Sequence, residues 1–580
     1  MRNALALVAL TLAALALRMW GIDHCVPHYK EADAHMALHV ELIRQGATEP
    51  DKQHNDAQYP IVLPGALSLL PDTQADPGSA ATLEEHLAAA AHVYVETRVE
   101  IAVLGVLAIP LTFLLARRFL AHGWSLFAAA LVATSFLHQF FAQQARPHAA
   151  AASVFLLAVL AAMRLARRPN AWNHLLALAA AALSIGTLQS GLATLLPLAV
   201  ASWLGTIRVV HEPAPKLALR LASPLFALPL IALASFAVFY PYLRYEGTEA
   251  AYASPVVDGT TLVWGDHRLD LHDWKGQGFV TLARTLWFYE PVLLGLLVLA
   301  GAALAARKLA IYRPLERWTD FWVAAAFVLP YLIAVGLFRN TFERFLLPLL
   351  PYLAVCAAWG LSFWSEKLTR VPRAVSAVAA AATLALPTFA CARLAWLRSR
   401  DDTLERAAQW FSHQSDATRT PIYVIPFFDL PLARSAESLQ PGDKRPAAIL
   451  SRWSVYQKRR GPQALPEPRF DLRYLVPRPD LGFPWPKAEA DPAGYLRALG
   501  PGYFVLDMSR QPTNLGLDRV RESVRQLGTL VHREAPEADG ATREFGFPFE
   551  DELVPDWPNV LARALRIEAV GPVVEIYRVR

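Results

Sequence analysis

The chain has 580 residues, of which 54% are hydrophobic and 18% charged, and its mean hydropathy is +0.27. A soluble chain is typically about 45–50% apolar and about 25% charged, so this composition argues against a plain cytosolic enzyme and against a disordered chain. The net charge is only +5, without a basic run, which disfavours a nucleic-acid partner. Three cysteines are too few for a disulfide scaffold. The composition therefore indicates a multi-span membrane protein with a soluble part attached.

Apolar stretches long enough to cross a bilayer, about 17–25 residues each, recur along the chain. The first could be a signal peptide, since Arg2 precedes it, but Arg18-Met-Trp-Gly after it is typical of an interfacial anchor and further spans follow. We therefore predict eleven spans. They lie at about 3–20, 99–116, 123–142, 148–166, 172–189, 191–207, 221–240, 286–305, 319–337, 345–364 and 374–394.

Cationic residues in the short loops predict the orientation of these spans. If the amino terminus is cytoplasmic, the outside turns hold three of them, Arg146, Arg339 and Arg344. The cytoplasmic segments then hold sixteen: Arg2, Arg117, Arg118, Arg164, Arg167, Arg168, Arg208, Lys216, Arg220, Arg307, Lys308, Arg313, Arg317, Lys367, Arg370 and Arg373. The asymmetry favours a cytoplasmic amino terminus.

An odd number of spans then places the tail outside, together with a first loop at about 21–98 and a middle loop at about 241–285. The expected fold is mainly α, a polytopic membrane helical bundle over 1–394. A soluble extracytoplasmic α/β domain is expected over 395–580.

The tail changes character after the last span. Asp401 and Asp402 can cap a helix that runs through Gln409-Trp410-Phe411, and a helical stretch follows near 515–527. Strands are predicted at Ile422–Pro426, Tyr503–Leu506 and Val573–Val579. Eight prolines between 462 and 492 favour irregular backbone there. Because the tail has no phosphate-cradling glycine loop, nucleophile elbow or metal spacing, we interpret it as a cap over the membrane site or a contact for an acceptor.

The first loop carries the residues best suited to chemistry. A helix from about 31 to 45 puts Glu31, His35 and His39 at i, i+4 and i+8 on one face, while Asp33 lies about 200° around from Glu31. One carboxylate and two imidazoles form a ligand set suited to Zn²⁺ or a similar divalent metal, and a carboxylate alone can act as a base. The alternative is structural, since acidic residues stabilise a helix start and loop histidines are usually solvated.

Two arginines lie where the outer membrane surface is expected. Arg146 is in the turn after span three, and Arg344 is in the turn before span ten. An arginine fork binds a phosphate group through paired charge-assisted hydrogen bonds. The alternative is an interfacial arginine whose charged head reaches for water.

Several motifs occur in an order that resembles a known family. An acidic motif opens the first loop, Tyr59-Pro60 leads an apolar stretch, and Arg98 opens span two. The Ala-Arg146-Pro147 turn and Arg344-Phe-Leu-Leu-Pro348 at span ten follow. Residues 1–400 thereby resemble the GT-C membrane glycosyltransferases, in the branch of protein O-mannosyltransferases and bacterial aminoarabinose transferases.

This resemblance implies transfer of a sugar from a polyprenyl-phosphate carrier to an acceptor hydroxyl, with inversion, at the outer face of the membrane. Arg146 and Arg344 match positions expected to hold the carrier phosphate. The family's first-loop motif is usually Asp-Glu, whereas this chain has Lys30 followed by Glu31 and then Asp33. Either Glu31 or Asp33 takes the catalytic role, as base or metal ligand, or the usual activity is lost.

The acceptor predicted in this way is a hydroxyl of a lipid, a polysaccharide or a protein, and the Ala-, Leu- and Arg-rich usage suggests a bacterial plasma membrane. The alternatives are a lipid or solute transporter and a non-catalytic assembly subunit with an outer sensing domain. A transporter is expected to carry charged residues within its spans and often two similar halves, whereas these spans are mostly clean Ala/Leu runs.

Overall fold

The computed structural model describes most of the chain. The residues outside the described part are 1, 30–33, 47–59, 73–76, 79–80, 210–213, 241–260, 265–266, 271–272, 307–317, 368–372, 426–428, 440–450, 476–487, 489, 508–516 and 538–559.

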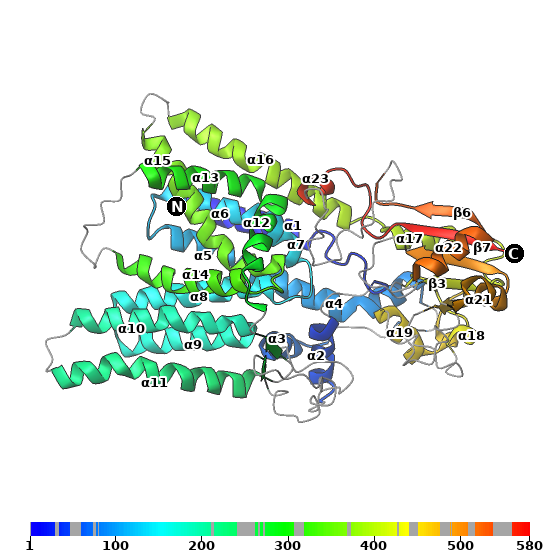
Figure 1. Cartoon of the computed structure of the whole chain (residues 1–580), viewed down its shortest axis with the longest axis horizontal. Helices are drawn as coiled ribbons and strands as arrows, with labels where there is room; N and C mark the ends of the chain where they lie inside the picture. The colour runs from blue at the N-terminus through cyan, green and yellow to red at the C-terminus, as the bar shows by residue number, and fades with distance from the viewer. Residues whose placement is uncertain are drawn as a thin grey trace.

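Apolar helices form an elongated bundle, and the C-terminal part of the chain follows at one end of it (Figure 1). The bundle contains α1 (Arg2–Met19), α4 (Leu83–Val106), α5 (Ala108–Ala116), α6 (His122–Ala133), α7 (Phe136–Ala142), α8 (His148–Arg167), α9 (Ala171–Thr187), the 3₁₀ helix η2 (Gln189–Thr194), α10 (Leu195–Val209), α11 (Ala214–Phe239), α12 (Gln277–Tyr289), α13 (Pro291–Ala306), α14 (Thr319–Leu337), the 3₁₀ helix η7 (Glu343–Leu349), α15 (Leu350–Lys367) and α16 (Arg373–Arg398). This confirms the mainly helical fold predicted from the apolar stretches.

Five described helices are each long and apolar enough to cross a membrane, and seven if each bent pair counts as one span. Three further apolar helices in the described residues are shorter, Asn3–Met19, Ala171–Thr187 and Ala227–Phe239. Every apolar stretch predicted above falls on a helix or a pair of helices. The count of eleven spans stays a prediction.

Two of the candidate spans are bent, and one carboxylate joins the two breaks. The axes of α6 and α7 differ by 50°, and those of α12 and α13 by 115°. Glu290, between α12 and α13, accepts hydrogen bonds at Oε1 from Ser135 Oγ (2.6 Å) and from the Leu137 backbone N–H (2.9 Å). Ser135 also caps α7. Its hydrogen bond to Glu290 therefore connects the break between α6 and α7 to the break between α12 and α13.

The first loop lies at the same end of the bundle as the C-terminal part (Figure 1). It contains α2 (Ala34–Arg44) and α3 (Val62–Ser68), and the middle loop contains a hairpin of β1 (Thr261–Trp264) and β2 (His267–Asp270). Ala37 and Val40 of α2 share a buried cluster with Val93 and Tyr94 of α4. An isolated helix of this length is marginal in water, so this packing holds α2 in place.

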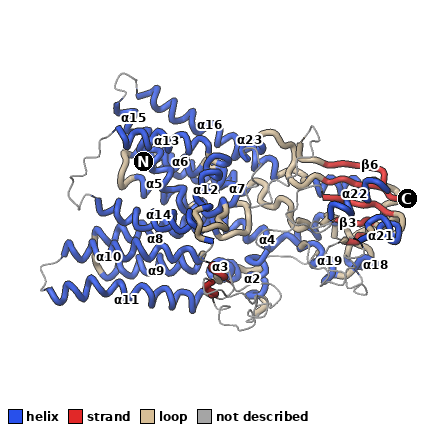
Figure 2. Tube along the Cα trace, viewed as in Figure 1, coloured by secondary structure: helices blue, strands red, loops and turns tan. Residues whose placement is uncertain are grey.

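The C-terminal part contains a mixed five-stranded sheet, red in Figure 2, with the strand order β4-β3-β5-β7-β6. Strand β3 pairs in parallel with β4 and β5, and β7 pairs antiparallel with β5 and β6. Its elements are α17 (Thr403–Ser412), β3 (Ile422–Ile425), α18 (Ala436–Leu439), α19 (Arg452–Arg460), the 3₁₀ helix η8 (Pro462–Ala464), β4 (Leu472–Tyr474), α21 (Pro492–Leu499), β5 (Gly502–Asp507), α22 (Leu517–Leu527), β6 (Gly528–Glu534), α23 (Val560–Ala564) and β7 (Val574–Val579).

Helices cover both faces of this sheet. On one face, Leu404 and Phe411 of α17 share a buried cluster with Ile422 and Val424. On the other, Val520 and Val524 of α22 and Leu496 of α21 share a cluster that includes Tyr423 and Ile425 of β3. Successive β3 side chains thus point to opposite faces, as the two-residue period of a strand requires.

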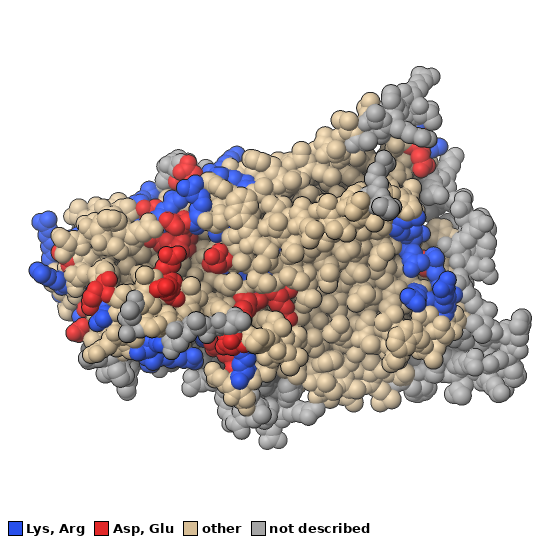
Figure 3. Space-filling view, turned by 180° about the vertical axis from the view of Figure 1, so that it is seen from behind, with Lys and Arg blue, Asp and Glu red and all other residues tan. Residues whose placement is uncertain are grey.

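Charged side chains are distributed unevenly along the long axis of the molecule. On the face seen in Figure 3, Lys and Arg gather at the end of the bundle away from the C-terminal part, and a broad belt without charge separates them from the mixed charges at the other end. An uncharged belt of this kind is expected where lipid surrounds the bundle.

Candidate active site

Glu31 and Asp33, the predicted catalytic acids, lie outside the described residues. The same holds for the side chain of His35, which is in α2. His39, the last member of the predicted metal triad, is fully buried in α2. The predicted triad of Glu31, His35 and His39 is therefore described at only one of its three side chains.

The described start of α2 lies beside the N-terminal end of α8. Met36 of α2 shares a buried cluster with Ile101 of α4 and with Ala149 and Ala150 of α8. His148 is the first residue of α8 and immediately precedes Ala149. The first loop is thus brought against the turn that carries Arg146.

Arg146 and Arg344 lie near His148. Arg146 lies in the turn between α7 and α8, and Arg344 lies in η7, which packs against both of these helices. The centre of the Phe345 ring lies 5.7 Å from that of the His148 ring and 5.4 Å from the Arg344 guanidinium carbon. The structure therefore brings Arg344 close to His148, two residues after Arg146, although Arg344 lies far along the chain.

Local sequence explains how each arginine is held. Pro147 caps α8, where its fixed φ suits a helix start, and the Arg146 backbone N–H donates to Gln144 O at 2.7 Å to form the preceding turn. The Arg344 guanidinium carbon lies 4.2 Å from the centre of the Phe342 ring and 5.4 Å from that of Phe345. Stacking on aromatic rings fixes the plane of a guanidinium and leaves its edge for other contacts.

Arg146 is only 4% exposed, so its charged group lies inside the protein. An interfacial arginine would instead direct this group to water. Nearby, Gln144 Oε1 and His148 Nδ1 are buried without a hydrogen-bond partner among the residues that the structure describes. A buried polar atom without a partner costs stability, and such atoms gather where a ligand or water completes the bonding. Arg146 can bind an anion, and Gln144 Oε1 can accept a hydrogen bond from a hydroxyl of the same ligand.

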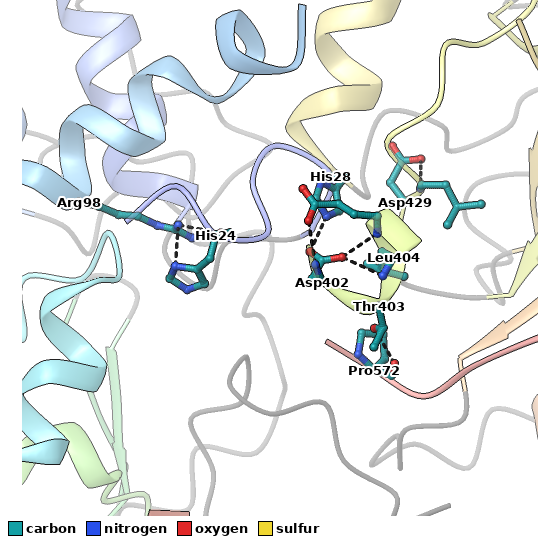
Figure 4. Close-up of polar contacts among 10 residues, drawn as sticks. His24, His28, Arg98, Asp402, Thr403, Leu404, Asp429 and Pro572 are labelled. Atoms are coloured by element: carbon teal, nitrogen blue, oxygen red, sulfur yellow. Dashed lines mark hydrogen bonds and ion pairs between the residues drawn. The ribbon is translucent and has the colours of Figure 1, made fainter. Parts of the chain in front are cut away.

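A second set of polar residues joins the first loop to the bundle and to the C-terminal part (Figure 4). Arg98 Nη1 of α4 donates to Ile22 O at 2.7 Å and to His24 O at 2.9 Å. Four residues later, His28 Nε2 lies 2.7 Å from Asp402 Oδ2, and both side chains are 1% exposed. Burial lowers the pKa of His28, but the carboxylates of Asp402, Glu405 and Asp429 together raise it by more, so this pKa lies above its ordinary value.

Sequence reasoning missed His28. Asp402 was predicted as a helix cap, and it is one: Oδ1 accepts from the backbone N–H groups of Leu404 and Glu405 at 2.8 Å, while Glu405 Oε2 accepts from Asp402 N at 2.8 Å. The signal for the cap is the Asp-x-x-Glu spacing of a capping box. No local signal marks the partner from the first loop.

His28, Asp402 and Glu405 offer ligand atoms within 4.8 Å of one another, the one such group among the described residues. Their oxygens already accept the backbone and histidine hydrogen bonds given above, which is the pattern of a structural joint. We assign this cluster the role of connecting the first loop to α17.

No family model and no curated protein matches the chain. Among solved structures, the chain is similar to ArnT from Cupriavidus metallidurans bound to undecaprenyl phosphate, with 14% identity, 98% of this chain and 97% of that chain covered, and a TM-score of 0.43. It is also similar to the apo oligosaccharyltransferase of Archaeoglobus fulgidus (13% identity, 87% and 69% covered, TM-score 0.45) and to the mycobacterial arabinofuranosyltransferase AftD (18%, 99% and 40%, 0.36).

Proposed function

We propose that this protein is an integral membrane glycosyltransferase. It moves a sugar from a polyprenyl-phosphate carrier to an acceptor hydroxyl of a lipid, a polysaccharide or a protein at the outer face of a bacterial plasma membrane. The observation that carries the proposal is the packing of η7 on α8, which places Arg344 and His148 against the same Phe345 ring, two residues after Arg146. The motif order in the sequence supports the same reaction.

The arginines suit the leaving group of this reaction. When the bond between the anomeric carbon and the phosphate oxygen breaks, the electron pair goes to the polyprenyl phosphate and its negative charge grows. Guanidinium groups fixed before the reaction stabilise that developing charge more than they stabilise the bound donor. Arg344, already stacked on Phe342, and the buried Arg146 provide such fixed groups.

The attacking hydroxyl needs a proton acceptor. We assign this role to Glu31 or Asp33, because the first loop leads into α2, whose Met36 packs beside Ala149 at the arginine site. The acceptor oxygen bonds to the anomeric carbon as its proton passes to the carboxylate, and the carrier phosphate departs from the opposite face. Such a single displacement inverts the anomeric carbon.

This mechanism passes through no metal. Of the ligand set Glu31, His35 and His39, the structure describes only the His39 side chain, which is fully buried. If all three bound a divalent ion, the ion would supply a Lewis acid that lowers the acceptor hydroxyl's pKa, and Glu31 would be a ligand instead of the base.

The orientation proposed from the sequence puts the arginine site outside. The cationic end of the bundle in Figure 3 would face the cytoplasm, and the first loop and the C-terminal part would share the outer side. A polyprenyl-phosphate sugar presented at that face could then reach the arginines from the lipid.

The test uses the full chain in lipid nanodiscs with radiolabelled polyprenyl-phosphate pentoses and hexoses. We expect consumption of at least one donor and release of the polyprenyl phosphate. Arg344→Ala should lose donor use, whereas Arg339→Ala, which changes an exposed arginine shortly before it, should behave as wild type. Donor transport across the membrane without release of the carrier phosphate would overturn the proposal in favour of a transporter.

A further inference from the structure

The first loop is held between the bundle and the C-terminal part. Arg98 of α4 binds the carbonyl groups of Ile22 and His24, as described above. On the other side, the Trp453 backbone N–H at the start of α19 donates to Pro27 O at 3.0 Å. The backbone of the segment from Ile22 to Pro27 therefore contacts both the helical bundle and the C-terminal part.

Helix α19 also binds the outer end of α4. The Trp453 ring is fully buried in a cluster with Ala90 of α4, and Leu83 and Leu87 pack against this cluster. Tyr456 OH lies 2.9 Å from His86 Nδ1 of α4. With an apolar anchor and a polar contact on one helix, α19 is fixed relative to the bundle.

The same helix reaches α2 through an ion pair between Arg452 and Glu41. The two side chains are 13% and 14% exposed, so water screens this pair much less than a surface pair. Arg44, further along α2, binds Glu96 of α4 at 2.9 Å. Helix α2 thus forms one ion pair with α4 and another with α19.

We propose that α19 positions α2 for the transfer reaction, with Arg452 as the positioning residue. This inference rests on the proposed function, because α2 directly follows the segment that carries Glu31 and Asp33. An eleven-residue helix has little stability of its own, so its placement depends on such contacts. The C-terminal part then acts mainly on the rate of the chemical step, because Arg344 of the donor phosphate site is held by Phe342 and Phe345 and not by α2.

The experiment compares Arg452→Gln with the charge reversal Arg452→Glu/Glu41→Arg in the full chain. The control is Arg473→Gln, which breaks an ion pair inside the C-terminal part, where Nε and Nη2 of Arg473 both donate to Asp471 Oδ2. Amide hydrogen exchange of residues 34–44 is measured by mass spectrometry in nanodiscs, and kcat and donor KM are measured in parallel.

In Arg452→Gln we expect α2 exchange to rise and kcat to fall by about tenfold each, the effect of losing one charge-assisted contact. Donor KM should stay unchanged, the reversal should restore both quantities, and the control should match wild type. Unchanged α2 exchange in Arg452→Gln, or no recovery in the reversal, would overturn the inference. If wild type transfers no sugar, the proposed function fails, while the exchange data still decide whether α19 holds α2.

Discussion

His28 Nε2 lies 2.7 Å from Asp402 Oδ2, although 374 residues separate the two in the chain. The pair joins the first loop to the helix cap of α17, and both side chains are nearly inaccessible to water. A buried pair of this kind depends on both partners, because removing one leaves the other charge buried without compensation.

This pair predicts a pH dependence of stability. The pKa of His28 is raised above its ordinary 6.5, so the stabilisation by protonated His28 is complete below about pH 6.5 and is lost as the pH rises through the raised pKa. His28→Gln should lower the free energy of unfolding by about 3 kcal/mol near pH 6, where His28 is protonated and Asp402 ionised, and remove this part of the dependence. Thermal unfolding across pH measures both effects.

The matched control is His413→Gln, which changes an exposed histidine at the other end of α17. It should keep the wild-type pH profile. A His28→Gln protein that follows the same profile as wild type would show that the pair does not titrate in this range.

The first-loop carboxylates give the second prediction. Glu31→Gln or Asp33→Asn should lower transfer by about 10²–10⁴-fold, the range expected for loss of a general base, while membrane insertion stays intact. We favour Glu31, because it occupies the matched motif position. Asp23→Asn, an exposed carboxylate in the same loop, is the control. If both single variants and the double variant retain full turnover, the catalytic acid is elsewhere.

Arg344 gives the third prediction. Arg344→Lys keeps the charge but loses the planar fork, so donor use should weaken, and Arg344→Ala should weaken it further. Loss of a buried charge-assisted contact costs about 2–5 kcal/mol, or roughly thirty- to several-thousand-fold in affinity. Arg146→Lys should act in the same direction. Donor saturation curves measure the effect, and curves identical to wild type would reduce Arg344 to an interfacial anchor.

Topology is the fourth prediction. Reporter fusions after residue 118 should report cytoplasm, and fusions at 265 and 580 should report the outside, because cations in short loops stay in the cytoplasm. A cytoplasmic carboxyl terminus would place the arginine site on the wrong side of the membrane for the proposed reaction.

The fifth prediction concerns metal. Transfer should survive treatment with a strong chelator, because a carboxylate can accept the proton and the carrier phosphate is already a good leaving group. Metal content is measured in wild type and in His35→Ala. Activity that disappears on chelation and returns with Zn²⁺, together with metal lost in His35→Ala, would make Glu31, His35 and His39 ligands.

The sequence alone determined the elements whose formation depends on near neighbours. Apolar stretches became helices, and short runs rich in β-branched and aromatic residues became β3, β5 and β7, close to their predicted bounds. Asp402 became the cap of α17, because a cap and the residue three positions later interact locally. Helix α19 was not predicted: its sequence, RWSVYQKRR, is mostly polar, and nothing in its pattern marks Trp453 as fully buried.

Only the tertiary structure decided which distant residues meet. The contact of His28 with Asp402, the ion pair of Arg452 with Glu41 and the approach of Arg344 to His148 all join segments far apart in the chain. Local periodicity tells which face of a helix is apolar, but not which other helix covers that face. That choice follows from the packing of the whole bundle, in which Ser135 at one helix break binds Glu290 at another.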